Sequence, residues 1–304
     1  MLLRHLFLFL SRRQRLRRWM EESPQAAALT SRFVAGRRIE DALGVTRRLN
    51  RQGISTTLAY LGESVTTLEE AQAARDVALD LLGHIQDQRL QANLSVKLTQ
   101  LGIDVAEAAC RENAAALAEK ARGAGNFIRI DMESSAYTAR TLALVEDLHA
   151  AYGNVGAVIQ AYLHRSAQDV EDLIGRGVGV RLCKGAYAES PEAAFARKSE
   201  VDACFAKLAR RLLDAGNNPA LASHDEKLLR EAIAFAERQG VSKANYEIQM
   251  LYGIRRGLQA KLVAQGHRLR VYVPFGMAWY PYFMRRLAER PANAYFVARN
   301  LFRR

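Results

Sequence analysis

The feature that most constrains the fold is a repeated alternation of short apolar segments with longer helix-like segments after residue 53. Eight apolar segments rich in β-forming residues occur at 54–61, 94–98, 127–130, 157–163, 178–183, 220–223, 246–250 and 271–274. Stretches rich in Ala, Leu, Glu and Arg, each long enough for a helix, separate most of them, at 69–86, 104–123, 139–152, 191–214, 226–239 and 253–265. Near-continuously apolar strands that alternate with helices are typical of a parallel sheet covered by helices.

Eight such strands predict an α/β protein with a (β/α)8 barrel. The chain has 304 residues, of which 49% are apolar, and one barrel needs about 250 residues. A doubly wound open sheet is the alternative. No G-x-G-x-x-G or G-x-x-x-x-G-K-[ST] motif follows a strand, so the usual phosphate-binding loops of nucleotide-binding sheets are missing. Their absence favours the barrel, which we expect to occupy residues 54–304.

Two segments precede the predicted barrel. Residues 1–22 form a leader in which an apolar run comes before a cluster of arginines. This order is the reverse of a secretory signal, and the run is shorter than the roughly 18 apolar residues of a membrane-spanning helix. The leader could lie on an anionic membrane surface or dock on the protein's own body, with a transit-like segment as a third option. Residues 23–53 are expected to form a helical arm, helical from residue 25 to about 52, where Gly53 ends the helix.

Composition restricts the partners and the compartment. Six arginines precede the first acid, Glu21, so residues 1–20 supply half of the net charge of +12. No aromatic interleaving or nucleic-acid motif accompanies this charge, and we expect no nucleic-acid partner. The three cysteines, Cys110, Cys183 and Cys204, are too scattered for a disulfide framework. They predict free thiols in a reducing, cytoplasmic compartment, with peripheral contact of the leader at the inner face of the cell membrane as an option.

Hydrogen-bonding or ionisable side chains lie at the predicted C-terminal ends of six strands. They are Lys97, Asp131, Gln160, Arg181 with Lys184, His224, and Glu247 with Gln249. Any one of them could form an ordinary salt bridge, but a shared polar pocket explains all six better, because the active site of a barrel lies at this end. Neither H-E-x-x-H nor C-x-x-C occurs, so no metal site is predicted, and the lack of G-x-S-x-G disfavours a serine hydrolase.

This pocket is basic, which suits an anionic cofactor and a carboxylate substrate. Arg181 or Lys184 beside a flavin would stabilise its electron-rich reduced ring. Near the C-terminus, the segment RRLAE places Arg285 and Arg286 four and three residues before Glu289, so helical periodicity can bring them to one face. The two guanidinium groups can bind a carboxylate while Glu289 attracts an ammonium. An exposed intrahelical ion pair is the simpler alternative.

Seven ordered segments show a family resemblance that runs from about residue 30 to the C-terminus. They are SVKLTQLG (95–102), IRIDMES (128–134), VIQAYLHR (158–165), VRLCKGAYAE (180–189), ASHDEKLL (222–229), YEIQMLYGIRR (246–256) and VYVPFGMAWYPYFMRRLAERP (271–291). In these segments the chain resembles the monofunctional bacterial proline dehydrogenases. The resemblance implies a distorted TIM-like barrel that uses FAD to oxidise L-proline to Δ1-pyrroline-5-carboxylate. Hydride would pass from proline C5 to flavin N5, and the electrons then to a membrane quinone.

The resemblance also implies roles for individual residues. Asp131 would be an active-site aspartate that orients Lys97 or Tyr272, and Arg181 would lie near flavin N5. The implied substrate-binding residues are Lys97, Leu251, Tyr272, Arg285, Arg286 and Glu289. The implied cofactor-binding residues are Met132, Gln160, Arg181, Lys184, Gly185, Ala186, Ser223, His224 and Gln249. Lys97 and the arginines would favour the neutral amine that hydride loss requires, whereas Glu289 would oppose it, and sequence leaves this balance open.

One segment departs from the family pattern. The family commonly has Y-V-P-Y-G-R-D-W where this chain has YVPFGMAW at 272–279, so Met277 stands where relatives place an arginine that can pair with a glutamate, here Glu63. We therefore predict a looser closure over the substrate and a higher KM than in relatives. Two other functions remain open. One is oxidation of another cyclic imino acid such as hydroxyproline, whose C4 hydroxyl Tyr272 would crowd. The other is a nucleic-acid-binding or membrane-binding module built on the leader.

Overall fold

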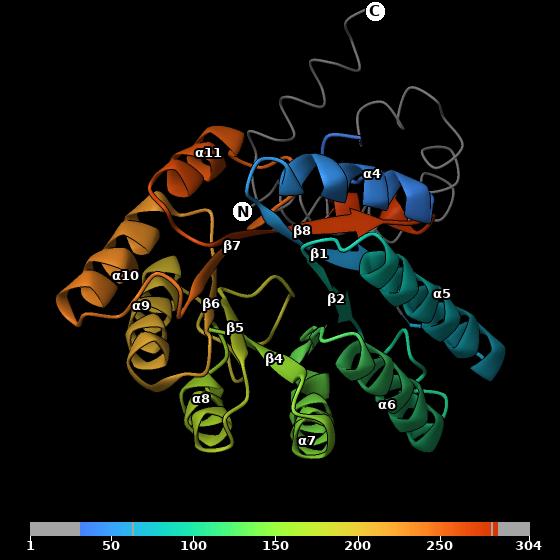
Figure 1. Ribbon diagram of the computed structural model, residues 1–304. Coiled ribbons are helices and arrows are strands. Elements are labelled where there is room, and N and C mark those ends of the chain that lie inside the picture. The colour runs from blue at the N-terminus through green and yellow to red at the C-terminus, as the bar shows by residue number, and fades with distance from the viewer. Residues whose placement is uncertain (1–30, 63, 281, 285–304) are drawn as a thin grey trace, which may run out of the picture.

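The computed structural model describes residues 31–62, 64–280 and 282–284 (Figure 1). Its eight strands form a closed parallel barrel in which each strand pairs with the next and β8 returns to β1. The strands are β1 Ser55–Tyr60, β2 Ala92–Val96, β3 Ile128–Ile130, β4 Val155–Gln160, β5 Val180–Cys183, β6 Ala220–Ala222, β7 Glu247–Leu251 and β8 Leu269–Phe275. The barrel prediction is therefore confirmed, and the open sheet is excluded.

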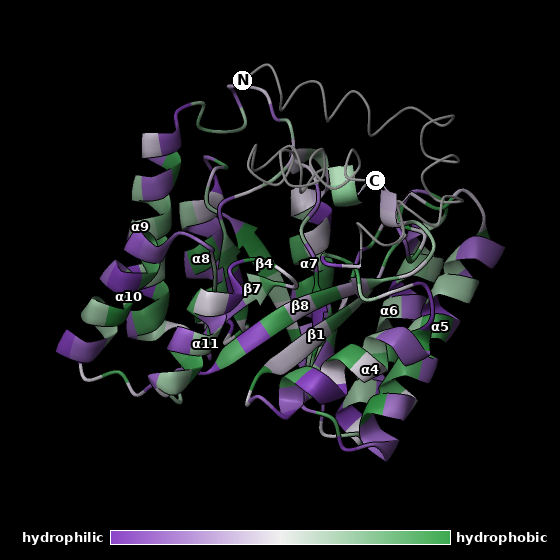
Figure 2. Ribbon diagram, turned by 90° about the horizontal axis from the view of Figure 1, so that it is seen from above, coloured by the Kyte–Doolittle hydropathy of each residue, from purple (hydrophilic) through white to green (hydrophobic). Residues whose placement is uncertain are grey.

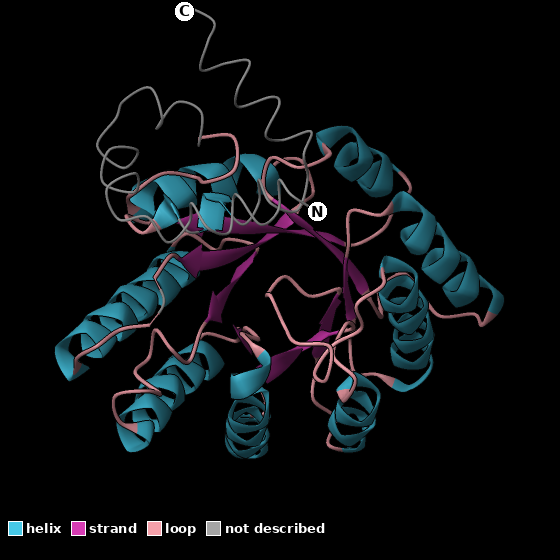
Figure 3. Ribbon diagram, turned by 180° about the vertical axis from the view of Figure 1, so that it is seen from behind, coloured by secondary structure: helices cyan, strands magenta, loops and turns pink. Residues whose placement is uncertain are grey.

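Helices surround this barrel (Figure 3). They are α4 Ile39–Asn50, α5 Leu68–Asp87, α6 Glu107–Gly123, α7 Ser135–Tyr152, α8 Ser166–Gly175, α9 Lys198–Ala215, α10 Glu226–Arg238 and α11 Arg256–Ala264. Most lie within a few residues of the predicted helical stretches. Helix α8 was not among them, because the gap between the predicted strands 157–163 and 178–183 is the shortest of the predicted connections. Helix α9 starts later than expected, since the Phe195 N–H donates to the carbonyl of Tyr162 and holds this segment on the β4 loop.

The arm before β1 is only partly helical, which corrects the expectation of one helix from residue 25 to about 52. Among the described residues, α4 begins at Ile39, and residues 31–38 run as non-helical chain beside the end of β8. The Ala35 N–H donates to the carbonyl of Pro274 at 2.9 Å, and the Gly276 N–H donates to that of Gly36 at 2.9 Å. These tertiary hydrogen bonds override the helical propensity of the segment.

Side chains from the outer faces of the strands pack against the helices and form the main core. Figure 2 shows this layering, with a hydrophobic β4 inside and hydrophilic outward faces on helices such as α10. No helix in the described part of the chain is long and apolar enough to cross a membrane. The leader, residues 1–22, lies outside the described residues.

A second apolar cluster lies at the C-terminal ends of β7, β8 and β1. Its buried members are Phe33, Val34, Leu61, Ile254, Trp279, Tyr280, Tyr282, Phe283 and Met284. Leu251 and Tyr272, both predicted to contact substrate, pack against it. The N-terminal arm and the segment after β8 thus meet above one side of the barrel mouth, next to the predicted site.

Candidate active site

The interior of the barrel contains a buried polar network. Alternate residues of a strand point to the same face, so Asp131 follows Arg129 inward, Gln249 follows Glu247, and Tyr272 follows Arg270. Hydrogen bonds link residues from β2, β3, β5, β7 and β8 across the interior. The strand-end residues expected to converge from β3, β5 and β7 do so.

Asp131 is the centre of this network. One carboxylate oxygen accepts hydrogen bonds from Ser95 Oγ at 2.6 Å and from Arg181 Nη1 at 2.7 Å. The other accepts from the Tyr272 hydroxyl at 2.8 Å. The predicted partnership of Asp131 with Tyr272 is therefore present. Burial, followed by the negative charge of Asp131, raises the pKa of Tyr272 well above its ordinary value, so this hydroxyl keeps its proton at neutral pH.

Two of the three guanidinium nitrogens of Arg181 donate hydrogen bonds to protein groups. Nε donates to Gln249 Oε1 at 2.5 Å, and Nη1 donates to Asp131 and, at 3.0 Å, to Ser95. The guanidinium carbon lies 5.4 Å from the centre of the Tyr272 ring, close enough for a cation–π contact. Nη2 is buried and has no hydrogen-bond partner among the described residues. An unpaired buried donor is unfavourable, so this nitrogen is a place for a ligand to bind.

A deeper layer of charge, which sequence reasoning only partly found, lies below Arg181. Arg270 Nε donates to both oxygens of Glu247 at 2.9 and 3.0 Å, and Gln249 Nε2 donates to Glu247 at 2.5 Å. Burial tends to raise the pKa of Glu247, but Arg270, the hydrogen bond from Gln249 and the charge of Arg129 together lower it. Arg129 Nη1 donates to the carbonyls of residues 157 and 179. The sequence does indicate that Arg129 and Arg270 point into the barrel, because each lies two residues before a predicted site residue, Asp131 or Tyr272.

Other predicted cofactor residues lie around the barrel mouth. Gln160 is buried at the end of β4, where its Nε2 donates to the carbonyl of Glu133 at 2.8 Å. Met132 is also buried, directly after Asp131. His224 Nε2 accepts from the Leu251 N–H at 2.9 Å, which joins the ends of β6 and β7. Ser223 Oγ accepts from a backbone N–H two residues on and starts the loop into α10.

Lys184 lies after β5 between two carboxylates. Its Nζ is 2.6 Å from Asp202 and 3.1 Å from Asp225. Burial tends to raise the pKa of each acid, but Lys184 and Lys198 together contribute more in the opposite direction, and both pKa values are lowered. The charge of Lys184 is therefore largely compensated within the protein. It is not the free cation that its sequence position suggested.

Gly185 and Ala186 follow in a loop against Tyr162. Gly185 has φ of +112°, and a Cβ atom there would overlap the Tyr162 ring. Packing against Tyr162 therefore explains why position 185 has no side chain. The predicted reason, which is backbone access to a cofactor, stays a prediction. Ala186 is half-buried beside it.

The substrate side of the predicted site is only partly described. Lys97 is half-buried, and its ammonium has no hydrogen-bond or ion-pair partner in the part of the chain that the structure describes. Met277 is 57% exposed just beyond β8. Four predicted residues lie outside the described residues: Arg285, Arg286, Glu289 and Glu63. The pair that would bind the substrate carboxylate, and the role of Glu63 in closing over the substrate, therefore stay predictions.

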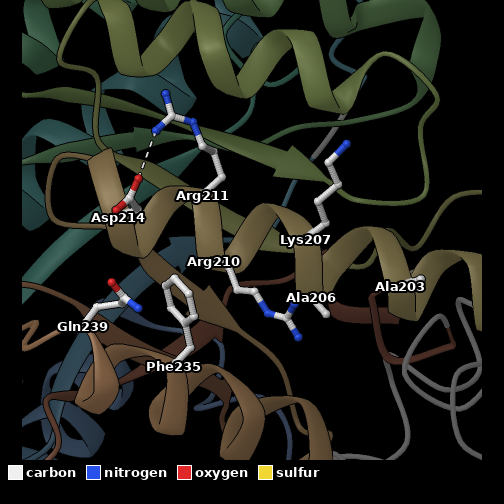
Figure 4. Close-up of a pocket in the computed structure, with 8 residues that line it drawn as sticks. All are labelled: Ala203, Ala206, Lys207, Arg210, Arg211, Asp214, Phe235 and Gln239. Carbon is white, nitrogen blue, oxygen red and sulfur yellow. Dashed lines mark hydrogen bonds and ion pairs between the residues drawn. The ribbon is translucent and has the colours of Figure 1, made fainter.

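A surface groove between α9 and α10 is separate from this network. Its lining is partly basic. Figure 4 shows Arg211 paired with Asp214 on α9, with Phe235 on α10 and Gln239 directly after that helix. None of the predicted site residues lines it. The predicted site residues that the structure describes therefore lie elsewhere, in and around the barrel mouth.

Comparison with known proteins identifies the family of this chain. The family model described as proline dehydrogenase matches residues 42–299. The chain belongs to the proline dehydrogenase family. Proline dehydrogenase 2 of Bacillus subtilis (strain 168) is 36% identical over 301 residues, which cover 99% of both chains. A proline dehydrogenase of Deinococcus radiodurans is 37% identical over 280 residues, which cover 90% of each. The chain is thus an enzyme that oxidises proline, the first step of proline catabolism, and its family is flavin-dependent.

A solved structure shares the barrel. Proline utilization A (PutA) from Bdellovibrio bacteriovorus, inactivated by N-propargylglycine, matches with a TM-score of 0.82 and 27% sequence identity. The match covers 87% of this chain and 33% of that protein. The chain thus spans about one third of the length of that proline dehydrogenase relative, and the likeness concerns the barrel.

Proposed function

We propose that the barrel mouth binds FAD beside Arg181 and uses it to oxidise L-proline to Δ1-pyrroline-5-carboxylate. The supporting observation is Arg181 itself, a buried cation held through Nε and Nη1 with Nη2 unpaired among the described residues. Such a nitrogen suits a hydrogen-bond acceptor on a ring that becomes negatively charged on reduction.

The residues divide into groups with separate tasks. When bound, FAD would supply the acceptor, at its N5, for the hydride that leaves proline C5. Arg181 would stabilise the charge that develops, and Asp131 would hold Arg181 and the Tyr272 hydroxyl in place. Substrate would be bound by Lys97, Leu251, Tyr272, Arg285, Arg286 and Glu289. The cofactor would be contacted by Met132, Gln160, Arg181, Lys184, Gly185, Ala186, Ser223 and His224. Gln249, also a predicted cofactor residue, accepts a hydrogen bond from Arg181.

Exclusion of water from one side of the barrel mouth would favour hydride transfer there. Leu251 and Tyr272 pack on the apolar cluster at the mouth, so that side of the site is screened from water. Electrons would leave to a quinone, which places the cytoplasmic enzyme next to a membrane. The basic leader is the proposed contact, and a protein starting near residue 23 should lose sedimentation with anionic vesicles. Equal sedimentation of both proteins would contradict this membrane contact.

Two experiments test the proposal. Heat-denatured protein should release a flavin that co-chromatographs with FAD, and release of FMN or of no flavin would contradict it. Because PutA from Bdellovibrio bacteriovorus is inactivated by N-propargylglycine, we expect the same compound to inactivate this enzyme with a lasting change in the flavin spectrum. Inactivation without a spectral change would place the reaction away from the flavin.

The carboxylate-binding pair can be tested separately. Arg286→Ala should raise the KM for proline by a factor of about 100, because a charge-assisted bidentate contact is lost, while flavin remains bound. Arg238→Ala, which removes an exposed arginine at the end of α10, is the matched control. Loss of flavin from Arg286→Ala would reassign this residue to the cofactor.

A further inference from the structure

Glu247, Gln249 and Arg181 form a buried hydrogen-bonded chain inside the barrel. Gln249 Oε1 accepts from Arg181 Nε at 2.5 Å, and Gln249 Nε2 donates to Glu247 at 2.5 Å. All three residues are at most 7% exposed. Both ends of the Gln249 amide are therefore occupied by protein groups.

The direction of the Gln249 amide decides whether Arg181 is held. A glutamine side chain can turn over and exchange its oxygen and its NH2 group, which have similar size. Only the oxygen can accept from Arg181 Nε, because an NH2 group there would bring two donors together. An ionised Glu247 only accepts hydrogen bonds, and it therefore selects the orientation in which the NH2 group faces it. Arg270, bonded to both Glu247 oxygens, keeps that carboxylate ionised.

We propose that Gln249 is a positioning residue for Arg181 and that Glu247 sets its orientation, so that Arg181 Nη2 stays directed at the cofactor. This inference rests on the proposed role of Arg181 beside the flavin. It also revises the expectation for Gln249, which acts through Arg181 and does not need to touch the cofactor. Asp131 and Ser95 fix Nη1, and Gln249 fixes Nε, so the guanidinium cannot rotate.

Three variants test the orientation. Gln249→Met has similar volume but no acceptor, and it should lower kcat about tenfold while the KM for proline changes by less than about twofold, since Arg181 serves the cofactor. Glu247→Gln replaces the carboxylate that selects this direction with an amide that can both donate and accept, so only Arg181 Nε still favours it, and kcat should fall as well.

The third variant exchanges the two side chains, Glu247→Gln/Gln249→Glu. It again pairs one amide with one carboxylate, so that the direction of the amide is set. The amide introduced at position 247 would donate to the carboxylate introduced at position 249, and that carboxylate would accept from Arg181 Nε. The kcat of this double variant should recover to within about threefold of the wild-type value, as expected for a coupled pair.

A purely structural role of Glu247 gives a different result. If Glu247 matters only as the partner of Arg270, the double variant still lacks that carboxylate and should be no more active than Glu247→Gln. That outcome would overturn the proposal. Thermal unfolding is measured in parallel, and we expect both variants that lack Glu247 to be destabilised alike, so that activity and stability separate.

A measurement on flavin-free protein keeps this inference independent of the proposed function. Hydrogen exchange of the Arg181 Nε–H, followed by NMR on arginine-labelled protein and assigned with Arg181→Lys, should be faster in Gln249→Met and slow again in the double variant. Unchanged exchange in Gln249→Met would refute positioning. If exchange responds as expected but Arg181→Lys leaves kcat and the flavin reduction potential unchanged, then the proposed role of Arg181 fails and the positioning stands.

Discussion

The Arg181 guanidinium is confined by three neighbours that come from three different strands. Ser95 and Asp131 bind Nη1 and Gln249 binds Nε, so the charge has one position inside the barrel. Fixed charge of this kind needs no reorganisation when the substrate reacts, which makes it effective in catalysis. At the residue scale, Arg181 is therefore a fixed cation of the kind that the proposed mechanism requires.

Met277 stands where the family resemblance leads one to expect an arginine. Met277→Arg should lower the KM for proline about threefold, because an arginine at this exposed position could pair with Glu63 and close over the substrate. Met277→Gln, which is similar in length but uncharged, is the control. The same arginine in a Glu63→Gln background should lose the gain, and an unchanged KM in Met277→Arg would contradict the predicted gate.

At the scale of elements, an ion-pair cluster joins the end of β5 to α9 and to the start of α10. Lys184 contacts Asp202 and Asp225, and Lys198 adds a second cation to Asp202. Asp225 is also the N-cap of α10 and accepts from the Lys227 N–H at 3.2 Å, a favourable position for a negative charge. The cluster ties the loops that follow β5 and β6 to the first turns of α9.

This cluster predicts a loss of stability in acid. The pKa of Asp202 is lowered from its ordinary value of 3.8 in the folded protein. Its stabilisation is therefore present above that ordinary value and is lost as pH falls through the lower folded pKa. Asp202→Asn should cost about 1 kcal/mol of unfolding free energy at pH 7 and progressively less in acid. Asp76→Asn, at a 61% exposed carboxylate, is the control, and an Asp202→Asn cost that does not shrink in acid would contradict the account.

At the scale of the whole molecule, sequence predicted the barrel because near-continuous apolar strands and intervening helices record burial directly. It was less successful where tertiary contacts decide, as at residues 31–38, which bond to the end of β8 instead of extending α4. The site was predicted at strand ends, but Ser95, Arg129 and Arg270 were missed. Their pairing depends on which strands are neighbours across the barrel, and the separate strand sequences do not contain that information.

The most direct test of the central claim is anaerobic addition of L-proline to the purified protein, followed by visible absorption. The account predicts that the protein shows the bands of an oxidised flavin and that proline bleaches them, with Δ1-pyrroline-5-carboxylate formed in equal amount. Replacing Arg181 with methionine should slow the bleaching without preventing it, because a stabilising charge is lost and the reacting groups remain. A colourless protein, or flavin bands that L-proline leaves unchanged, would contradict the account.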